Sequence, residues 1–197
     1  MKSYFEAVQS LELTHNEVLT YKVKTETTCV GLFGKVSNIK NIIYYVPGGV
    51  KSLGLDTVKN ETKTKLPNAF TWFWMPLWLN KGYTIAVVDF PKKYFLKDMD
   101  PKERLSELRL ETLKTIVADF RIKFPTSKLL GYGHSYGSLE ISELAKLNLL
   151  DKIIIGSGTY RPSDNELYGE THVKELYSNN PVLIVHHVND LAQKCPY

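Results

Sequence analysis

The run Gly131 to Ser138, Gly-Tyr-Gly-His-Ser-Tyr-Gly-Ser, constrains the fold of this 197-residue chain more than any other segment. The segment 127–132, which contains Leu129 and Leu130, predicts a short strand that leads into it, and apolar residues at helical spacing follow it. Glycines stand two residues before and two residues after Ser135. The sequence therefore predicts a strand that turns sharply into a helix. The turn is too tight for side chains at the two glycine positions, and Ser135 lies at its tip.

A serine in this setting, Gly133-His134-Ser135-Tyr136-Gly137, has the G-x-S-x-G pattern of a nucleophile elbow. Acyl transfer by a serine needs a base to take its proton, an acid to orient that base, and hydrogen-bond donors for the oxyanion. The pattern thus predicts a serine nucleophile and directs the search for the other groups.

Further apolar runs give the chain an α/β organisation. Residues 18–24 alternate in polarity and residues 28–33 follow after a polar break, which predicts an antiparallel hairpin. Continuous apolar runs of the kind found in buried parallel strands cover residues 41–46, 84–90, 152–155 and 182–185. We predict a single α/β domain over residues 1–197, with a mostly parallel, doubly wound sheet and an N-terminal antiparallel hairpin.

Three helices are predicted between these strands. One covers residues 69–81, and Asp100-Pro101 begins a second that ends near Lys123. The third follows the glycine-rich run, with Leu139, Ile141, Leu144, Ala145 and Leu147 on its apolar face. The aromatic segment 70–78 is interpreted as core rather than as the lining of an acyl pocket.

The remaining site residues are sought where strands end, because reactive groups of doubly wound sheets lie at the carboxyl ends of the strands. The backbone N–H of Tyr136 and an N–H from the Gly49-Val50 turn are the predicted oxyanion donors. Asp190 follows the last predicted strand by a few residues and is the predicted orienting acid.

These motifs resemble the α/β-hydrolase superfamily, in particular bacterial serine-esterase-like members in which the acid follows a His-His pair. The matching segments, in family order, are residues 44–49, 82–91, 133–137 and 182–190. The resemblance implies a serine hydrolase that acts on an ester or related acyl substrate of small size, with Ser135 before Asp190 in the family's chain order. It implies no metal and no organic cofactor.

The chain departs from the family at the base, which in these enzymes is a histidine on a loop after one further strand. No histidine follows Asp190 in the sequence. The resemblance therefore implies a C-terminally incomplete hydrolase that lacks the last strand and the catalytic histidine. The candidate bases are His187, His186 and His172. The strand at 182–185 would then be an exposed edge, which favours a homodimer.

Composition and charge argue against some classes of function and location. The net charge of +4 comes from scattered lysines without a basic stripe, which argues against nucleic-acid binding. No apolar segment is long enough for the core of a signal peptide or for a membrane span, so a cytoplasmic location is expected. Cys29 and Cys195 have no metal-binding spacing. Two alternatives remain open: a hydrolase-fold protein that binds without catalysis, and, ranked below it, a nucleotide-binding α/β protein.

Overall fold

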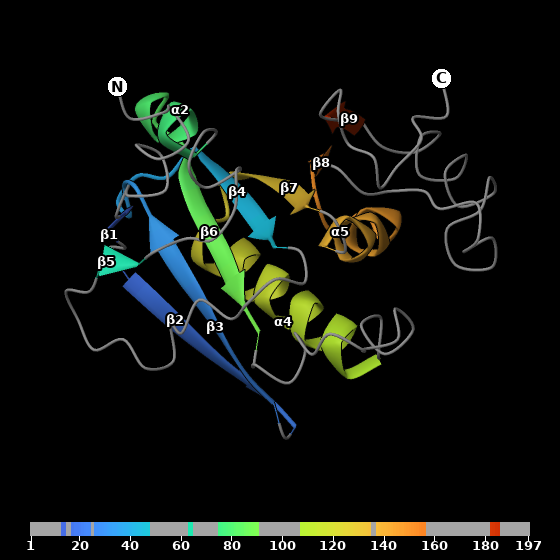
Figure 1. Cartoon of the computed structure of the whole chain (residues 1–197). Coiled ribbons are helices and arrows are strands. Elements are labelled where there is room, and N and C mark those ends of the chain that lie inside the picture. Colours follow the sequence, from blue (N-terminus) through green and yellow to red (C-terminus); the bar gives the residue numbers. More distant parts are fainter. Residues whose placement is uncertain are drawn as a thin grey trace, which may run out of the picture.

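The computed structural model describes a central β-sheet and the helices that pack on it. The described residues are 13–14, 17–24, 26–47, 63–64, 75–90, 107–134, 137–156 and 182–185. Among them, seven strands form the sheet in the order β2-β3-β6-β4-β7-β8-β9 (Figure 1). The strands are β2 (Glu17–Val23), β3 (Glu26–Phe33), β4 (Asn41–Val46), β6 (Thr84–Asp89), β7 (Lys128–His134), β8 (Lys152–Gly156) and β9 (Val182–Val185). Separately, β1 (Leu13–Thr14) pairs antiparallel with β5 (Lys63–Thr64).

The strand directions confirm the predicted pattern. β2 and β3 form the antiparallel hairpin, in which Val23 lies opposite Glu26, and β3 also pairs antiparallel with β6. From β6 to β9 every neighbouring pair is parallel. β4 and β6 are adjacent and parallel, so the chain between them makes a crossover connection.

Helices cover both faces of the sheet. In the described part of the chain, α2 (Met75–Asn80) packs on one face, and α4 (Glu107–Lys123) and α5 (Gly137–Lys146) pack on the other (Figure 1). Adjacent residues of β4 pack on opposite faces of the sheet. Tyr44 meets Phe120 of α4 edge to face with 6.1 Å between ring centroids, and Tyr45 meets Tyr132 of β7 at 5.3 Å. Continuous apolar strands are therefore required, because both faces are buried.

The aromatic segment 70–78 is described from Met75 onward, and the prediction that it is core holds there only in part, because Leu77 is 47% exposed. Met75 is fully buried. Trp78 packs edge to face on Tyr83, with 4.8 Å between the ring centroids. Residues 70–74 lie outside the described ranges.

The end of α5 corrects one part of the predicted apolar face, because Leu147 is 49% exposed. The helix ends at Lys146, and Asn148 takes a left-handed backbone conformation with φ of 55°. The amide of Asn148 donates to Ala145 and that of Leu149 donates to Leu144, which together form a Schellman motif. This cap turns the chain away from the helix axis before Leu147 can join the buried face.

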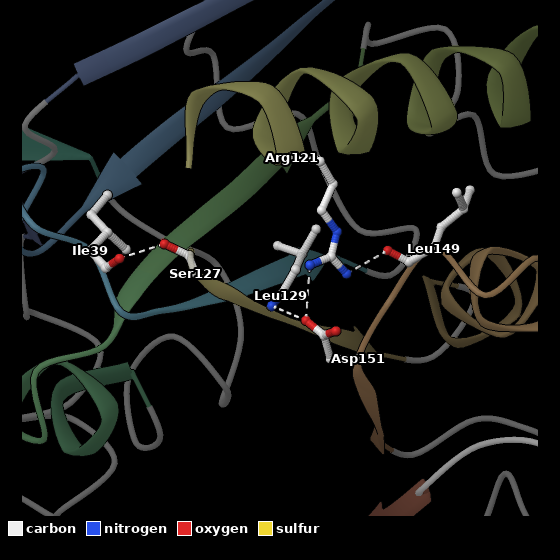
Figure 2. Close-up of polar contacts among 6 residues, drawn as sticks. All are labelled: Ile39, Arg121, Ser127, Leu129, Leu149 and Asp151. Atoms are coloured by element: carbon white, nitrogen blue, oxygen red, sulfur yellow. Dashed lines mark hydrogen bonds and ion pairs between the residues drawn. The ribbon is translucent and has the colours of Figure 1, made fainter. Parts of the chain in front are cut away.

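A polar network holds the amino end of β7 at the edge of the sheet opposite the glycine-rich turn (Figure 2). Asp151 Oδ2 accepts a hydrogen bond from the Leu129 amide at 2.6 Å and an ion pair from Arg121 at 3.0 Å. Arg121 also donates to the Leu149 carbonyl at 3.1 Å. On the other side of β7, the Ser127 hydroxyl donates to the Ile39 carbonyl. Helix α4, strand β7 and the start of β8 are thereby fixed relative to one another.

The charge of Asp151 contributes to this network. Burial alone raises the pKa of the Asp151 carboxyl, but the hydrogen bonds from Leu129 and Arg121 and the nearby positive charges outweigh it and lower the pKa below its ordinary value. Because the pKa is lower in the folded state, the stabilisation is complete above the unfolded pKa of about 4 and is lost as the pH falls through the folded-state pKa.

Replacing Asp151 with alanine is expected to lower the free energy of unfolding by about 1–2 kcal/mol at pH 7, since the buried Leu129 amide loses its acceptor. Urea denaturation should show this difference shrinking below about pH 4. Glu111→Ala is the control, because it removes only an exposed ion pair with Lys24 and should cost less than about 0.5 kcal/mol. Equal losses in the two variants would contradict a special role for the Asp151 network.

Candidate active site

The carboxyl ends of four parallel strands meet in register at one edge of the sheet. Val46 of β4 lies opposite Gly133 of β7, and His134 lies opposite Gly156 of β8. Gly156 in turn lies opposite Val185 of β9. The last residues of these strands therefore all lie at the same edge of the sheet. This is the edge at which doubly wound folds place their reactive groups.

Both glycines of the turn are required by close packing. A Cβ atom on Gly133 would lie 2.5 Å from the Gly137 carbonyl oxygen and 2.5 Å from Ser138 Cα. A Cβ atom on Gly137 would lie only 2.1 Å from the Val46 carbonyl oxygen. In both cases the obstacle includes backbone, which cannot rotate away as a side chain can. The predicted tight passage from β7 into α5 is confirmed at these two positions, and the first turn of α5 rests directly on the end of β4.

Ser138 joins the start of α5 to two strands. Its side chain is fully buried, and its hydroxyl donates to the carbonyl of Gly133 at 3.1 Å and to that of Gly156 at 3.4 Å. The Ser138 carbonyl accepts a hydrogen bond from the Ser142 hydroxyl at 2.7 Å. Sequence analysis did not identify Ser138. The available signal was a small polar residue directly after the second glycine, at a helix position that faces the sheet.

An uncharged aromatic layer lies beneath this edge on the α2 side. Tyr132 is 6% exposed, and burial raises the pKa of its phenol well above the ordinary value, so the group stays neutral across the physiological range. The Tyr132 hydroxyl sits so close to Gly156 that a Cβ atom there would be 2.4 Å away. Because side chains alternate along a strand, His134 shares this face with Tyr132, whereas Gly133 faces α5.

The other predicted site residues lie outside the described ranges. They are the nucleophile Ser135, the oxyanion donors Tyr136, Gly49 and Val50, the acid Asp190, and the candidate bases His187, His186 and His172. Cys195 also lies outside, whereas Cys29 is buried in β3. The structure thus describes the strand and the helix on either side of Ser135: β7 ends one residue before it, and α5 begins two residues after it.

Among the described residues, no group of three or more His, Cys, Asp and Glu side chains is placed to hold a metal ion. No helix among them combines the length and the apolar character that a membrane span requires.

Several solved structures are similar to the structure of this chain. No protein-family model matches the chain, and no curated protein matches its sequence. An alpha-beta serine hydrolase homologue from Coxiella burnetii matches with a TM-score of 0.54 at 12% identity, covering 88% of this chain and 87% of that one. A serine hydrolase without a lid from Xanthomonas campestris matches with a TM-score of 0.51 at 14% identity, covering 86% and 82%.

A larger protein also matches. The acylaminoacyl peptidase of Pyrococcus horikoshii gives a TM-score of 0.56 at 15% identity, and the match covers 94% of this chain. The chain spans only 34% of the length of that peptidase. At these identities the shared property is the fold.

Proposed function

Because the chain has the α/β-hydrolase fold, we propose that it is a serine hydrolase that cleaves an ester or related acyl bond of a small molecule, with Ser135 as the nucleophile. The observation that carries this proposal is the packing around Gly133 and Gly137. Side chains are excluded two residues before and two residues after Ser135, and the obstacle is backbone on both sides. A turn this tight between a buried strand and a helix is the setting that exposes a serine hydroxyl.

The chemistry follows from the elements that meet at this turn. The base takes the Ser135 proton while the serine oxygen attacks the carbonyl carbon of the substrate, and it passes that proton to the leaving alcohol as the acyl-enzyme forms. Water, which gives a proton to the same base, then hydrolyses the acyl-enzyme and restores the Ser135 hydroxyl. The oxyanion formed at each step would be held by the backbone N–H of Tyr136 and by one from the Gly49-Val50 turn. Two features support these donors. Tyr136 immediately precedes α5, whose positive dipole end faces the turn, and α5 rests on the end of β4, from which residues 48–50 continue.

We propose that the orienting acid follows β9 in the chain and that the base is a histidine on one side or the other of β9 in sequence. In the register of the sheet, Val185 is two strand spacings from His134, a separation of about 10 Å. Asp190 is the proposed acid. His187 and His186 follow β9 directly in sequence and His172 precedes it, so each is a candidate to take the Ser135 proton.

Fluorophosphonate labelling tests the proposal, because such probes react appreciably only with a serine that a base activates. The chain is incubated with the probe, and peptide mass spectrometry locates the adduct. We expect a single adduct on Ser135. Alanine variants of His172, His186 and His187 then identify the base, since the variant that removes it should label at least about a hundredfold more slowly.

Two results would overturn the proposal. One is an adduct on another serine. The other is no adduct on a chain that circular dichroism shows to be folded. The second result would favour the alternative of a hydrolase-fold protein that binds partners or ligands without catalysis.

A further inference from the structure

We propose that Ser138 is a positioning residue for the reaction of Ser135: its buried hydroxyl holds the turn in the geometry that the reaction needs. This inference rests on the proposed function and adds to it a residue that does not touch the substrate. Ser138 lies three residues after the nucleophile, on the first turn of α5.

The hydrogen bond from Ser138 closes a loop around the nucleophile. It runs from the Ser138 hydroxyl back to the carbonyl of Gly133 at 3.1 Å, across five positions of the chain, and Ser135 and Tyr136 lie between its ends. The side chain has no exposed surface, so water does not compete for this contact. The closed loop therefore limits the positions that the intervening residues can take.

The same hydroxyl reaches a second strand. Its distance to the Gly156 carbonyl at the end of β8 is 3.4 Å, so its single proton is shared between acceptors on β7 and β8. Three elements thus meet at one side chain: the strand before the nucleophile, the helix after it, and the neighbouring strand. Sliding of α5 along β7 would break both contacts.

A tether is needed here because the turn itself is built from glycine. Gly133 and Gly137 have no side chains with which to pack, and glycine has more accessible backbone conformations than any other residue. The Val46 carbonyl occupies the space that a Cβ atom on Gly137 would need, so it limits the approach of α5 on one side. The Ser138 hydroxyl supplies an attractive contact that prevents its withdrawal. Displacements of about 1 Å in a reacting group can lower rates by about a hundredfold, so a small loosening is measurable.

The test compares Ser138→Ala with Ser142→Ala. Ser142 is the matched control, because it is also a buried serine on α5 whose hydroxyl donates to a backbone carbonyl, but its acceptor is Ser138 within the same helix. For each variant the rate of fluorophosphonate labelling at saturating probe is measured, together with the melting temperature. We expect Ser138→Ala to label about tenfold more slowly or worse, and Ser142→Ala to stay within about twofold of the wild type.

A third variant, Ser138→Cys, keeps a weak donor of similar shape and should label at an intermediate rate. The inference is overturned if the wild type labels at Ser135 and Ser138→Ala labels equally fast, whatever its melting temperature, because Ser138 would then be structural only. It is also overturned if all the variants slow labelling in proportion to their lost stability. A wild type that does not label overturns the proposed function, and this inference with it, so the two failures are distinguishable.

Discussion

Replacing Ser135 with alanine is expected to lower kcat for a chromogenic short-chain ester by about a thousandfold or more, with little change in melting temperature. Alanine lacks the oxygen that forms the acyl-enzyme, and no other group can take over that step. The residual rate would come from the oxyanion donors and from substrate binding, which the substitution leaves in place. Steady-state kinetics on the purified variant measures kcat and KM separately.

Ser142→Ala is again the control, since it removes a serine hydroxyl seven residues further on, inside α5. Its kcat should stay close to the wild-type value. If Ser135→Ala retains more than about a tenth of the wild-type kcat while Ser142→Ala behaves normally, the nucleophile is another group and the proposed mechanism is wrong. A comparable loss in both variants would instead indicate that activity follows the integrity of α5.

The strands were predictable from the sequence because their pattern is local. Runs such as residues 42–46 and 153–155 are apolar at every position, which a chain can satisfy only when both faces of a strand are covered. The order of the strands in the sheet is less local. β6 lies between β3 and β4, and it pairs antiparallel with one and parallel with the other. No residue pattern in the sequence specified either of these neighbours.

Helix ends were harder to predict because they depend on backbone geometry that composition does not show. α2 and α5 end in the same way, with a residue of positive φ at Gly82 and Asn148 respectively. The glycine is a recognisable stop signal, whereas an asparagine in the same role is a weaker one. The apolar face of α5 was therefore extended one residue too far, to Leu147.

At the site, the sequence predicted the two glycines for the correct reason, because a steric requirement leaves a residue type as its mark. Ser138 left only a weaker mark, a small polar residue directly after the second glycine. Its importance depends on which carbonyls lie within reach of its hydroxyl, and one of them, Gly156, is 18 positions away in the chain. Contacts of that kind appear only when the fold brings distant segments together.

Gly137 is the position where a single methyl group should do the most damage. The Cβ atom of an alanine would lie 2.1 Å from the Val46 carbonyl oxygen, 2.8 Å from the Val46 carbonyl carbon and 3.0 Å from the Pro47 carbonyl oxygen. All three atoms are backbone at the end of a central strand, which is hydrogen-bonded to β6 and β7 on either side. The clash can be relieved only if α5 moves away from β4, and that movement breaks the contacts of Ser138.

Gly137→Ala is therefore expected to lower the free energy of unfolding by about 3 kcal/mol or more, and the melting temperature by about 10 °C, and to abolish labelling of Ser135. Gly82→Ala is the matched control. Gly82 has φ of 81° at the end of α2, and a Cβ atom there meets nothing within 4 Å, so the alanine costs only backbone strain of about 1 kcal/mol. Thermal denaturation of both variants separates steric exclusion from the loss of glycine as such. Equal melting temperatures for the two would mean that α5 is not seated on the end of β4, and the steric argument for the glycines around Ser135 would fail.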